Sequence, residues 1–286
     1  MQITVADDAP DYYDVRNPSA RSGNNGDKLL LAGREGSSNN YKLTLGSVVS
    51  EYTTPRHRHN FEQVRYPLNG DYGYAKDKVI PEGWVGYFTE GVYYGPQTQK
   101  QGLRLINLQF GGASGNGYLS KRQRQEAYAA LAKRGKFEKG VYTYIDEKGQ
   151  RHNKDSYEAI WEEASGRPVV YPRPRYEDCI IMNPANYSWV SAGPGVALKW
   201  LGTFTEGETR IGFVLLSPGG KIMLDSRRAP EIIFLTRGSI EHAGKVYPKH
   251  TAFELEVSDG AVTIAGREES EFLRVQLPFV EPLRPQ

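Results

Sequence analysis

The chain has 286 residues, of which 38% are hydrophobic and 24% are charged, a composition typical of a soluble globular protein with one large domain or two ordinary ones. Its 36 Lys and Arg residues nearly balance 34 Asp and Glu residues, and a net charge of +2 gives no reason to expect a nucleic acid or a membrane surface as a partner. The single cysteine, Cys179, excludes an intramolecular disulfide framework and a metal site built from several cysteines.

Residues 1–35 are polar and irregular, and we expect them to form an N-terminal arm. The first stretch, MQITVADDAPDYYDV, is acidic and lacks the apolar core of a secretory signal. No apolar run approaches the length of a membrane span. We therefore expect an intracellular, cytoplasmic protein.

From about Tyr41 the sequence changes to short runs of β-forming residues separated by Gly, Pro, Asn and Asp. Examples are YKLTLGSVVSEY, FEQVRYPL, WVGYFTEGVYYG and LRLINLQF. Short strands at near-regular spacing predict a sandwich or a small barrel, and we assign residues 36–112 to a first β-domain.

Residues 113–190 differ and predict a connector with two short helices. The stretch SKRQRQEAYAALAKRGKF begins at Ser120, a suitable N-cap, and ends at Gly135, a suitable C-cap. A hairpin is predicted around Glu147–Gly149, and the second helix, in KDSYEAIWEEASG, has Asp155 or Ser156 as its cap. Within YEDCIIMNP, we interpret Cys179 as a buried strand residue and not as a nucleophile.

The strand-and-turn pattern returns in residues 191–286 and resembles the first β-domain. QVRYPLNG, from Gln63 to Gly70, can be placed over EIIFLTRG, from Glu231 to Gly238, with an offset of 231 − 63 = 168. VIPEG at residues 79–83 then falls near VYPKH at residues 246–250. The sequence therefore predicts an internal repeat.

His57 and His59 are two of only five histidines, and they lie two residues apart. In a strand, residues i and i+2 share a face, so both imidazoles would project together with Phe61 and Gln63 while Arg58 points away. Two neutral imidazoles side by side begin a metal site. Gln63 could add an amide oxygen; Glu62 is the better ligand but would need a bulge or register change to reach the same face.

The stretch PRHRHNFEQVRYPLNGDYGY resembles the first motif of the cupin superfamily, which has two His separated by one residue, a carboxylate a few residues later, a hydrophobic strand and a Gly. IPEGWVGYFTEGVYYGP resembles the second motif. The resemblance covers residues 41–110 and, more faintly, 195–280. It implies an all-β bicupin, with two jelly-roll barrels in one chain.

This sequence departs from the cupin motifs at two positions. Gln63 stands at the carboxylate position, as in some cupins, and Tyr94 stands where the last histidine of the second motif would align. Tyr94 could ligate a metal as a phenolate, hydrogen-bond a metal-bound water, or only line the cavity. The resemblance therefore implies His57, His59 and Gln63 as metal ligands, with Tyr94 and Glu62 as candidate catalytic residues.

The second repeat lacks this ligand set. The same offset places Asp225 and Arg227 opposite the histidine pair and Glu231 opposite Gln63. An Arg among the ligands repels a cation and could pair with Glu231, so we predict no metal in the C-terminal barrel. The remaining histidines, His152, His242 and His250, are interpreted as structural or exposed.

The function predicted from these features is that of a mononuclear metal-dependent cupin enzyme. We expect a non-haem iron dioxygenase-type oxidoreductase with Fe(II), or with Mn, Ni or Zn, acting on a small aromatic or carbonyl-containing molecule. Nine aromatic residues between Phe61 and Tyr94 would supply a pocket, and Arg56, Arg58, Arg65 or Arg104 could anchor a carboxylate. A metal-dependent isomerase or lyase and a non-catalytic bicupin that binds a small ligand remain alternatives. A homodimer is expected from the resemblance.

Overall fold

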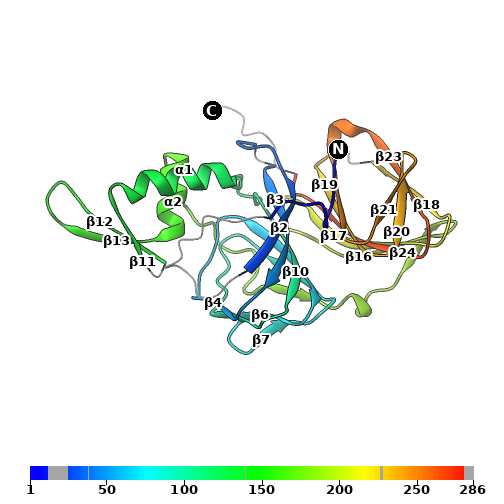
Figure 1. Ribbon diagram of the computed structural model, residues 1–286, viewed down its shortest axis with the longest axis horizontal. Coiled ribbons are helices and arrows are strands. Elements are labelled where there is room, and N and C mark those ends of the chain that lie inside the picture. Colours follow the sequence, from blue (N-terminus) through cyan, green and yellow to red (C-terminus); the bar gives the residue numbers. More distant parts are fainter. Residues whose placement is uncertain (12–24, 38, 139, 226–227, 280–286) are drawn as a thin grey trace.

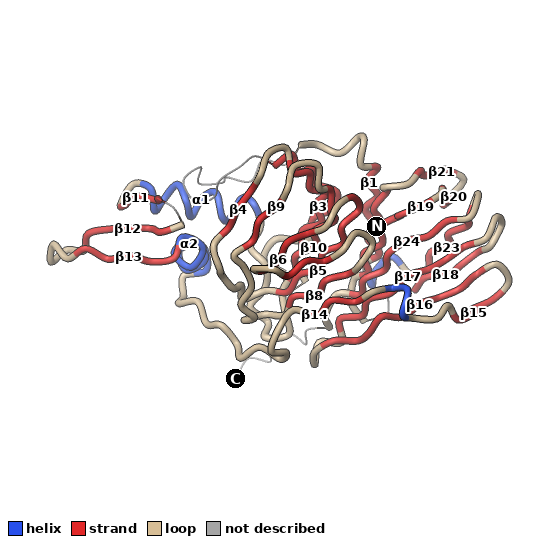
Figure 2. Tube along the Cα trace, turned by 90° about the horizontal axis from the view of Figure 1, so that it is seen from below, coloured by secondary structure: helices blue, strands red, loops and turns tan. Residues whose placement is uncertain are grey.

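The computed structural model describes residues 1–11, 25–37, 39–138, 140–225 and 228–279. Within these residues, three parts lie in a row: a small insert with the two helices, an N-terminal barrel in the middle and a C-terminal barrel at the far side (Figure 1). The perpendicular view in Figure 2 shows the same order. The helices in the described part of the chain are too short or too polar to cross a bilayer.

The N-terminal barrel is built on a six-stranded antiparallel sheet with the order β14-β8-β5-β10-β3-β2, and two further pairs, β4–β9 and β6–β7, complete it. Its strands are β2 (Asn25–Ala32), β3 (Tyr41–Val48), β4 (Tyr52–Thr54), β5 (Glu62–Asn69), β6 (Tyr72–Ala75), β7 (Lys78–Ile80), β8 (Val85–Phe88), β9 (Gln97–Gln99), β10 (Arg104–Phe110) and β14 (Ile180–Met182).

The C-terminal barrel has a seven-stranded sheet with the order β1-β22-β19-β24-β17-β16-β15 and a four-stranded sheet with the order β18-β23-β20-β21. Its strands are β1 (Gln2–Val5), β15 (Val190–Gly193), β16 (Val196–Phe204), β17 (Thr209–Leu216), β18 (Lys221–Asp225), β19 (Glu231–Arg237), β20 (Ser239–His242), β21 (Lys245–Pro248), β22 (Thr251–Leu255), β23 (Ala261–Gly266) and β24 (Ser270–Gln276). Two single-turn 3₁₀ helices, η1 (Pro184–Asn186) and η2 (Val257–Asp259), lie in its connections.

The two large sheets confirm the predicted repeat. The order β8-β5-β10-β3-β2 in the first barrel has the same connectivity as β22-β19-β24-β17-β16 in the second. β5 and β19, which contain the two segments aligned by the offset of 168, hold the same place in their sheets. The all-β, two-barrel architecture predicted from the sequence is therefore present.

Each large sheet also takes an edge strand from a segment distant in the chain. β1 pairs with β22 of the C-terminal barrel, and β14 pairs with β8 of the N-terminal barrel. The expectation that residues 1–35 are irregular is therefore wrong at β1 and β2, and residues 12–24 lie outside the described part of the chain. The predicted connector likewise ends in strands, since β14 and the first residue of β15 belong to it.

The insert consists of α1 (Lys121–Ala132), β11 (Gly135–Glu138), β12 (Val141–Ile145), β13 (Arg151–Asp155) and α2 (Ser156–Ser165). Ser120 caps α1 in a reciprocal capping box with Gln123, and Asp155 caps α2, as predicted. The hairpin turn between β12 and β13 also forms where it was predicted. The predicted C-cap at Gly135 is wrong: α1 is capped by Lys133, because Gly135 already pairs with Tyr144 in the sheet.

Alternation along β3, β5 and β10 gives the N-terminal sheet two different faces. Leu43, Val64 and Ile106 belong to one apolar cluster with Ile232 and Phe234 of the C-terminal barrel. This buried layer joins the two barrels. The residues between them point to the opposite side of the sheet, into the N-terminal barrel.

Candidate active site

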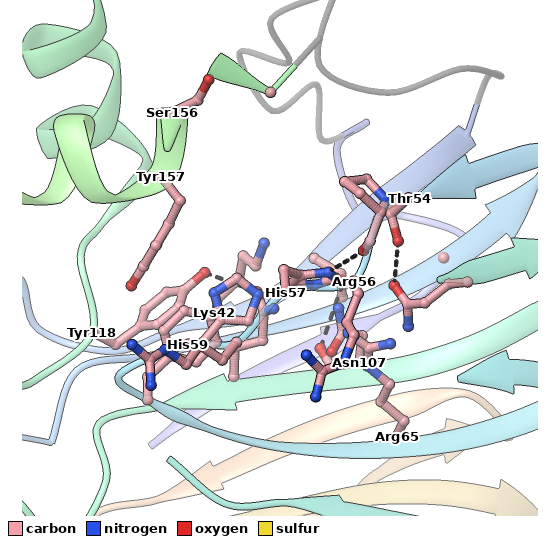
Figure 3. Close-up of a pocket in the computed structure, with 18 of the residues that line it drawn as sticks. Lys42, Thr54, Arg56, His57, His59, Arg65, Asn107, Tyr118, Ser156 and Tyr157 are labelled. Atoms are coloured by element: carbon pink, nitrogen blue, oxygen red, sulfur yellow. Dashed lines mark hydrogen bonds between the residues drawn. The ribbon is translucent and has the colours of Figure 1, made fainter. Parts of the chain in front are cut away.

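The interior of the N-terminal barrel contains a cavity of about 420 Å³ (Figure 3). Its wall includes Lys42 and Thr44 of β3, Asn107 and Gln109 of β10, and Arg65 of β5. These side chains are neighbours on one face of the sheet, since Asn107 pairs with both Thr44 and Arg65. Tyr118 and residues of α2 from the insert lie on another side of the cavity. The polar face of the sheet therefore lines a hollow interior.

His57 and His59 both line this cavity, and their ring centroids lie 5.0 Å apart. The predicted placement of the two rings side by side is confirmed. The predicted strand is not, because the pair lies between β4 and β5 and only His57 forms an isolated bridge. His57 Nδ1 lies 2.8 Å from the carbonyl oxygen of Pro55. If Nδ1 carries the proton and donates it to that oxygen, Nε2 presents a lone pair, as in histidine metal ligands.

Tyr94 lies beside the histidine pair because its backbone is paired with His57. The two residues exchange N–H···O bonds of 2.9 and 3.0 Å, and residues directly opposite in an antiparallel bridge place their side chains on the same face. The Tyr94 ring centroid lies 4.4 Å from that of His57 and 6.0 Å from that of His59. The position of the missing second-motif histidine is therefore adjacent to the pair.

Gln63 is buried behind Tyr94 and presents its nitrogen, not its oxygen, to the site. Its Nε2 donates to Tyr94 Oη at 2.7 Å, while its Oε1 accepts from Arg65 at 2.8 Å and from Gln109 at 3.0 Å. Arginine has only donors, so the amide oxygen must face Arg65. This orientation does not support the predicted role of Gln63 as a metal ligand; the amide instead positions Tyr94.

Glu62 points away from the histidines, on the face of β5 where alternation places it, and so its carboxyl group does not reach the predicted site. Its Oε2 accepts from Tyr87 at 2.7 Å and from Thr209 of the C-terminal barrel at 3.1 Å. The pairing of β5 with β10 is regular at Glu62 and shifts only near Arg104, so no bulge turns the carboxyl group inward. Burial raises the pKa of Glu62 to about 8.

The donor set available to a metal therefore consists of His57, His59 and Tyr94. Within the described ranges, no group of three or more His, Cys, Asp and Glu side chains is arranged to hold a metal, so a third protein ligand would have to be of another type. Tyr94 supplies a phenolic oxygen, and the N–H that Gln63 donates to this oxygen suits a phenolate ligand. Two imidazoles and a phenolate are compatible with Fe, Cu, Ni or Zn.

The cavity wall is predominantly basic. Among its described lining residues, Lys42, Arg56, Arg58, Arg65 and Arg124 stand against the acidic residues Asp27, Asp155 and Glu158. Arg104, also predicted as a carboxylate anchor, does not line the cavity. The excess of positive charge favours an anionic ligand.

Two of the arginines form a stack at the edge of the cavity. The Arg58 guanidinium carbon lies 4.8 Å from the Tyr93 ring centroid and 3.9 Å from that of Tyr171. The Arg56 guanidinium carbon lies 4.2 Å from the same Tyr93 centroid. Arg58 is thus held between the barrel and the segment that follows α2, at the edge of the cavity that the histidines also line.

The predicted aromatic residues divide among three surroundings. Phe61, Tyr72 and Tyr93 line the cavity. Tyr66 and Tyr87 lie in the apolar layer between the barrels. The others pack behind the cavity wall in a third cluster: Tyr74, Trp84, Phe88 and Tyr94.

Sequence reasoning missed Lys42, Tyr118 and the insert residue Tyr157. The Tyr157 ring lies 4.8 Å from that of His59, and its hydroxyl donates to Asn60 Oδ1 at 2.5 Å. A signal for Lys42 existed, because YKLTLG alternates polar and apolar residues within a buried strand. Nothing in the local sequence placed α2 against the histidines.

The corresponding place in the C-terminal barrel holds an ion pair. Arg274 donates to both oxygens of Glu231 at 2.7 and 2.8 Å. Arg227, the predicted partner of Glu231, lies outside the described residues, and the absence of a metal from this barrel stays a prediction.

The remaining predicted structural residues have ordinary surroundings. His152 lies on β13 beside Asp146, and His242 contacts the Thr263 carbonyl oxygen. His250 stacks on Phe234. Cys179 is buried next to β14, and burial raises the pKa of its thiol to about 12, which does not suit a nucleophile.

Comparison with solved structures identifies the fold. A protein of Nostoc punctiforme that is provisionally assigned as a dioxygenase matches with a TM-score of 0.61 at 11% identity, over 100% of this chain and 87% of that one. Bacillus subtilis oxalate decarboxylase matches with a TM-score of 0.56 at 11% identity, over 99% and 77%. Quercetin 2,3-dioxygenase of Acinetobacter baumannii matches with a TM-score of 0.51 at 11% identity, over 100% and 89%. No family model and no curated protein sequence matches the chain.

Proposed function

The chain has the bicupin fold, and we propose that it is a metal-dependent cupin enzyme whose N-terminal barrel acts on a small organic molecule. The observation that carries this proposal is the grouping of three rings, those of His57 and His59 at the cavity and that of Tyr94 directly behind them, with centroid distances of 4.4, 5.0 and 6.0 Å. These are the positions at which the cupin motifs place metal ligands. The names of the matched structures include dioxygenases and a decarboxylase, which suits either an oxidoreductase or a lyase.

Each residue around the site has a distinct task in this proposal. His57, His59 and Tyr94 would hold the metal, and a divalent ion such as Fe(II) would supply Lewis acidity and open positions for dioxygen and substrate. Gln63 fixes the orientation of Tyr94, and Arg65 and Gln109 fix Gln63. Tyr157 and the rest of the insert limit the entry of water on the His59 side. We expect dioxygenase-type chemistry, with Fe(II) ahead of Mn, Ni or Zn.

Metal analysis of purified variants tests this proposal. We expect His57→Ala to lower the bound metal at least tenfold, and Tyr94→Phe to lower it less, because Phe keeps the ring and removes only the ligand oxygen. His242→Ala, which changes a histidine in the other barrel, is the matched control and should bind as the wild type does. Equal metal contents in the wild type and His57→Ala would contradict the proposal.

One observation favours a second candidate function, that of a metal-free bicupin that binds a small acid. The Gln63 oxygen, a ligand in other cupins, accepts from Arg65 here, so a guanidinium charge already lies in the barrel interior. In that case neither histidine variant would change the metal content, while binding of an organic acid would persist. The same metal analysis therefore separates the two candidates.

A further inference from the structure

The cavity has two chemically different ends, with the histidine pair between them. Figure 3 shows Tyr118 and Tyr157 at one end and Thr54, Asn107 and Arg65 at the other. This separation arises because α2 of the insert reaches the first end, whereas the second end is built from barrel strands. A ligand that spans the cavity therefore meets both environments and passes the histidines.

The insert end holds a cluster of aromatic rings, with the Arg124 guanidinium carbon 5.9 Å from the Tyr118 ring centroid. Phe61 lies edge-on to Tyr118 and Tyr157, with centroid distances of 5.1 and 5.9 Å, and stacks on His59 at 4.4 Å. These separations are those of favourable aromatic pairs, and a further planar ring can add to such a cluster at low cost. This end suits an aryl group.

The barrel end is cationic and rich in hydrogen-bonding groups. The Arg65 guanidinium carbon lies 4.7 Å from the Tyr72 ring centroid and 5.4 Å from that of Tyr94, which fixes its plane. Asn107, the cross-strand neighbour of Arg65, and Thr44 line the cavity beside it. A planar guanidinium with fixed orientation matches the two oxygens of a carboxylate.

We propose that the site takes an arylalkanoic acid, with its carboxylate at Arg65 and its ring at the Phe61, Tyr118 and Tyr157 cluster. The carbons between these two groups would then lie beside His57 and His59. A cavity of about 420 Å³ is of the size that holds such a molecule. This inference shares its cavity with the proposed function but does not require a metal, because Arg65 supplies the charge.

Calorimetric titration with three probes tests the ligand class. The probes are 3-phenylpropionate, its neutral amide 3-phenylpropanamide, and propionate, which lacks the ring. We expect 3-phenylpropionate to bind at least about tenfold more tightly than either of the others, to metal-depleted and metal-loaded protein alike. Amide binding as tight as acid binding would overturn the carboxylate assignment, and propionate binding as tight as 3-phenylpropionate would overturn the aryl assignment.

Variants locate the two ends. Arg65→Met should remove most of the difference in affinity between 3-phenylpropionate and 3-phenylpropanamide. Arg65→Lys keeps the positive charge but not the planar pair of donors, and it should retain part of that difference. Arg104→Met, outside the cavity, is the control and should bind as the wild type does. Tyr157→Ala should weaken binding of 3-phenylpropionate and leave propionate unchanged.

Two outcomes separate this proposal from the metal proposal. If the protein holds no metal but the Arg65 variants still bind 3-phenylpropionate more weakly than the wild type does, only the metal proposal fails. If acid binding disappears on metal removal and survives Arg65→Met in protein that retains its wild-type melting temperature, the carboxylate binds elsewhere and the Arg65 assignment is wrong.

Discussion

The two barrels share one strand order and differ in what fills them. The interior of the C-terminal barrel is filled by the Glu231–Arg274 ion pair and by an apolar cluster that includes Leu216, Ile233, Phe253 and Phe272, all four at 0% exposure. The interior of the N-terminal barrel is a cavity with polar and basic walls. The same architecture is therefore used once as a packed core and once as a binding site.

The sequence offset of 168 shows where the two barrels diverged. Val64 and Tyr66 correspond to Ile232 and Phe234, and all four lie in the apolar layer between the barrels. Arg65 corresponds to Ile233, and these two face the interiors. The joining face is thus apolar in both repeats, while the interior positions determine which barrel can hold a ligand.

Substitutions at Arg65 and Ile233 should give the largest test of the difference between the two interiors. Ile233→Arg places a charge in a fully buried apolar cluster, and we expect it to lower the free energy of unfolding by more than about 4 kcal/mol or to prevent folding. Arg65→Ile removes one hydrogen bond to Gln63 beside an existing cavity, and we expect a loss of about 1–3 kcal/mol.

Urea unfolding followed by circular dichroism measures both effects. Ile233→Val is the control for a change of size without charge, with an expected cost of about 1 kcal/mol. Similar losses for Ile233→Arg and Arg65→Ile would show that a charge is tolerated equally well in the two interiors.

Local patterns were sufficient to predict the repeat and the elements nearest the site. Alternating strands with Gly and Pro turns predicted two β-domains, and Ser120 and Asp155 predicted where the helices begin. The spacing of His57 and His59 predicted neighbouring rings, and the rings are neighbours although only His57 forms a bridge, with Tyr94.

The parts that sequence did not predict depend on contacts between distant segments. Alternation along β5 already places Glu62 on the face opposite to Gln63, but its partner Thr209 comes from the second barrel, 147 residues away in the chain. The orientation of Gln63 depends on Arg65 and Gln109, and the approach of Tyr157 depends on how the insert folds back. Neither is encoded in a short motif.

The layer between the barrels contains a titratable group, Glu62, which should make the stability of the protein depend on pH. Glu62 has a pKa of about 8 in the folded protein against 4.5 for an ordinary glutamate, so the folded state keeps a proton that the unfolded state releases. The resulting stabilisation is complete below the unfolded pKa and is lost as the pH rises from about 4.5 to about 8. We expect this decline to reach about 2–4 kcal/mol.

Glu62→Gln should make the free energy of unfolding less dependent on pH over this range. The amide oxygen can still accept from Tyr87 and Thr209, so the variant should be more stable than the wild type at pH 8. Glu147→Gln, in the exposed turn of the insert, is the matched control. A pH profile identical to that of the wild type would show that Glu62 is ionised in the folded protein.

The smallest expected effect concerns the insert, which has no counterpart on the C-terminal barrel. The hydroxyl of Tyr157 donates to the fully buried Asn60, and this bond ties α2 to the segment that carries the histidines. Tyr157→Phe removes the bond but keeps the ring beside His59, so we expect a loss of about 1 kcal/mol. The loss should fall on the insert, with faster amide hydrogen exchange in α2 and unchanged exchange in β19 and β22. Tyr144→Phe, on β12 of the insert, should leave both regions unchanged; equal acceleration of α2 and the C-terminal strands in Tyr157→Phe would mean that the insert unfolds together with the whole molecule.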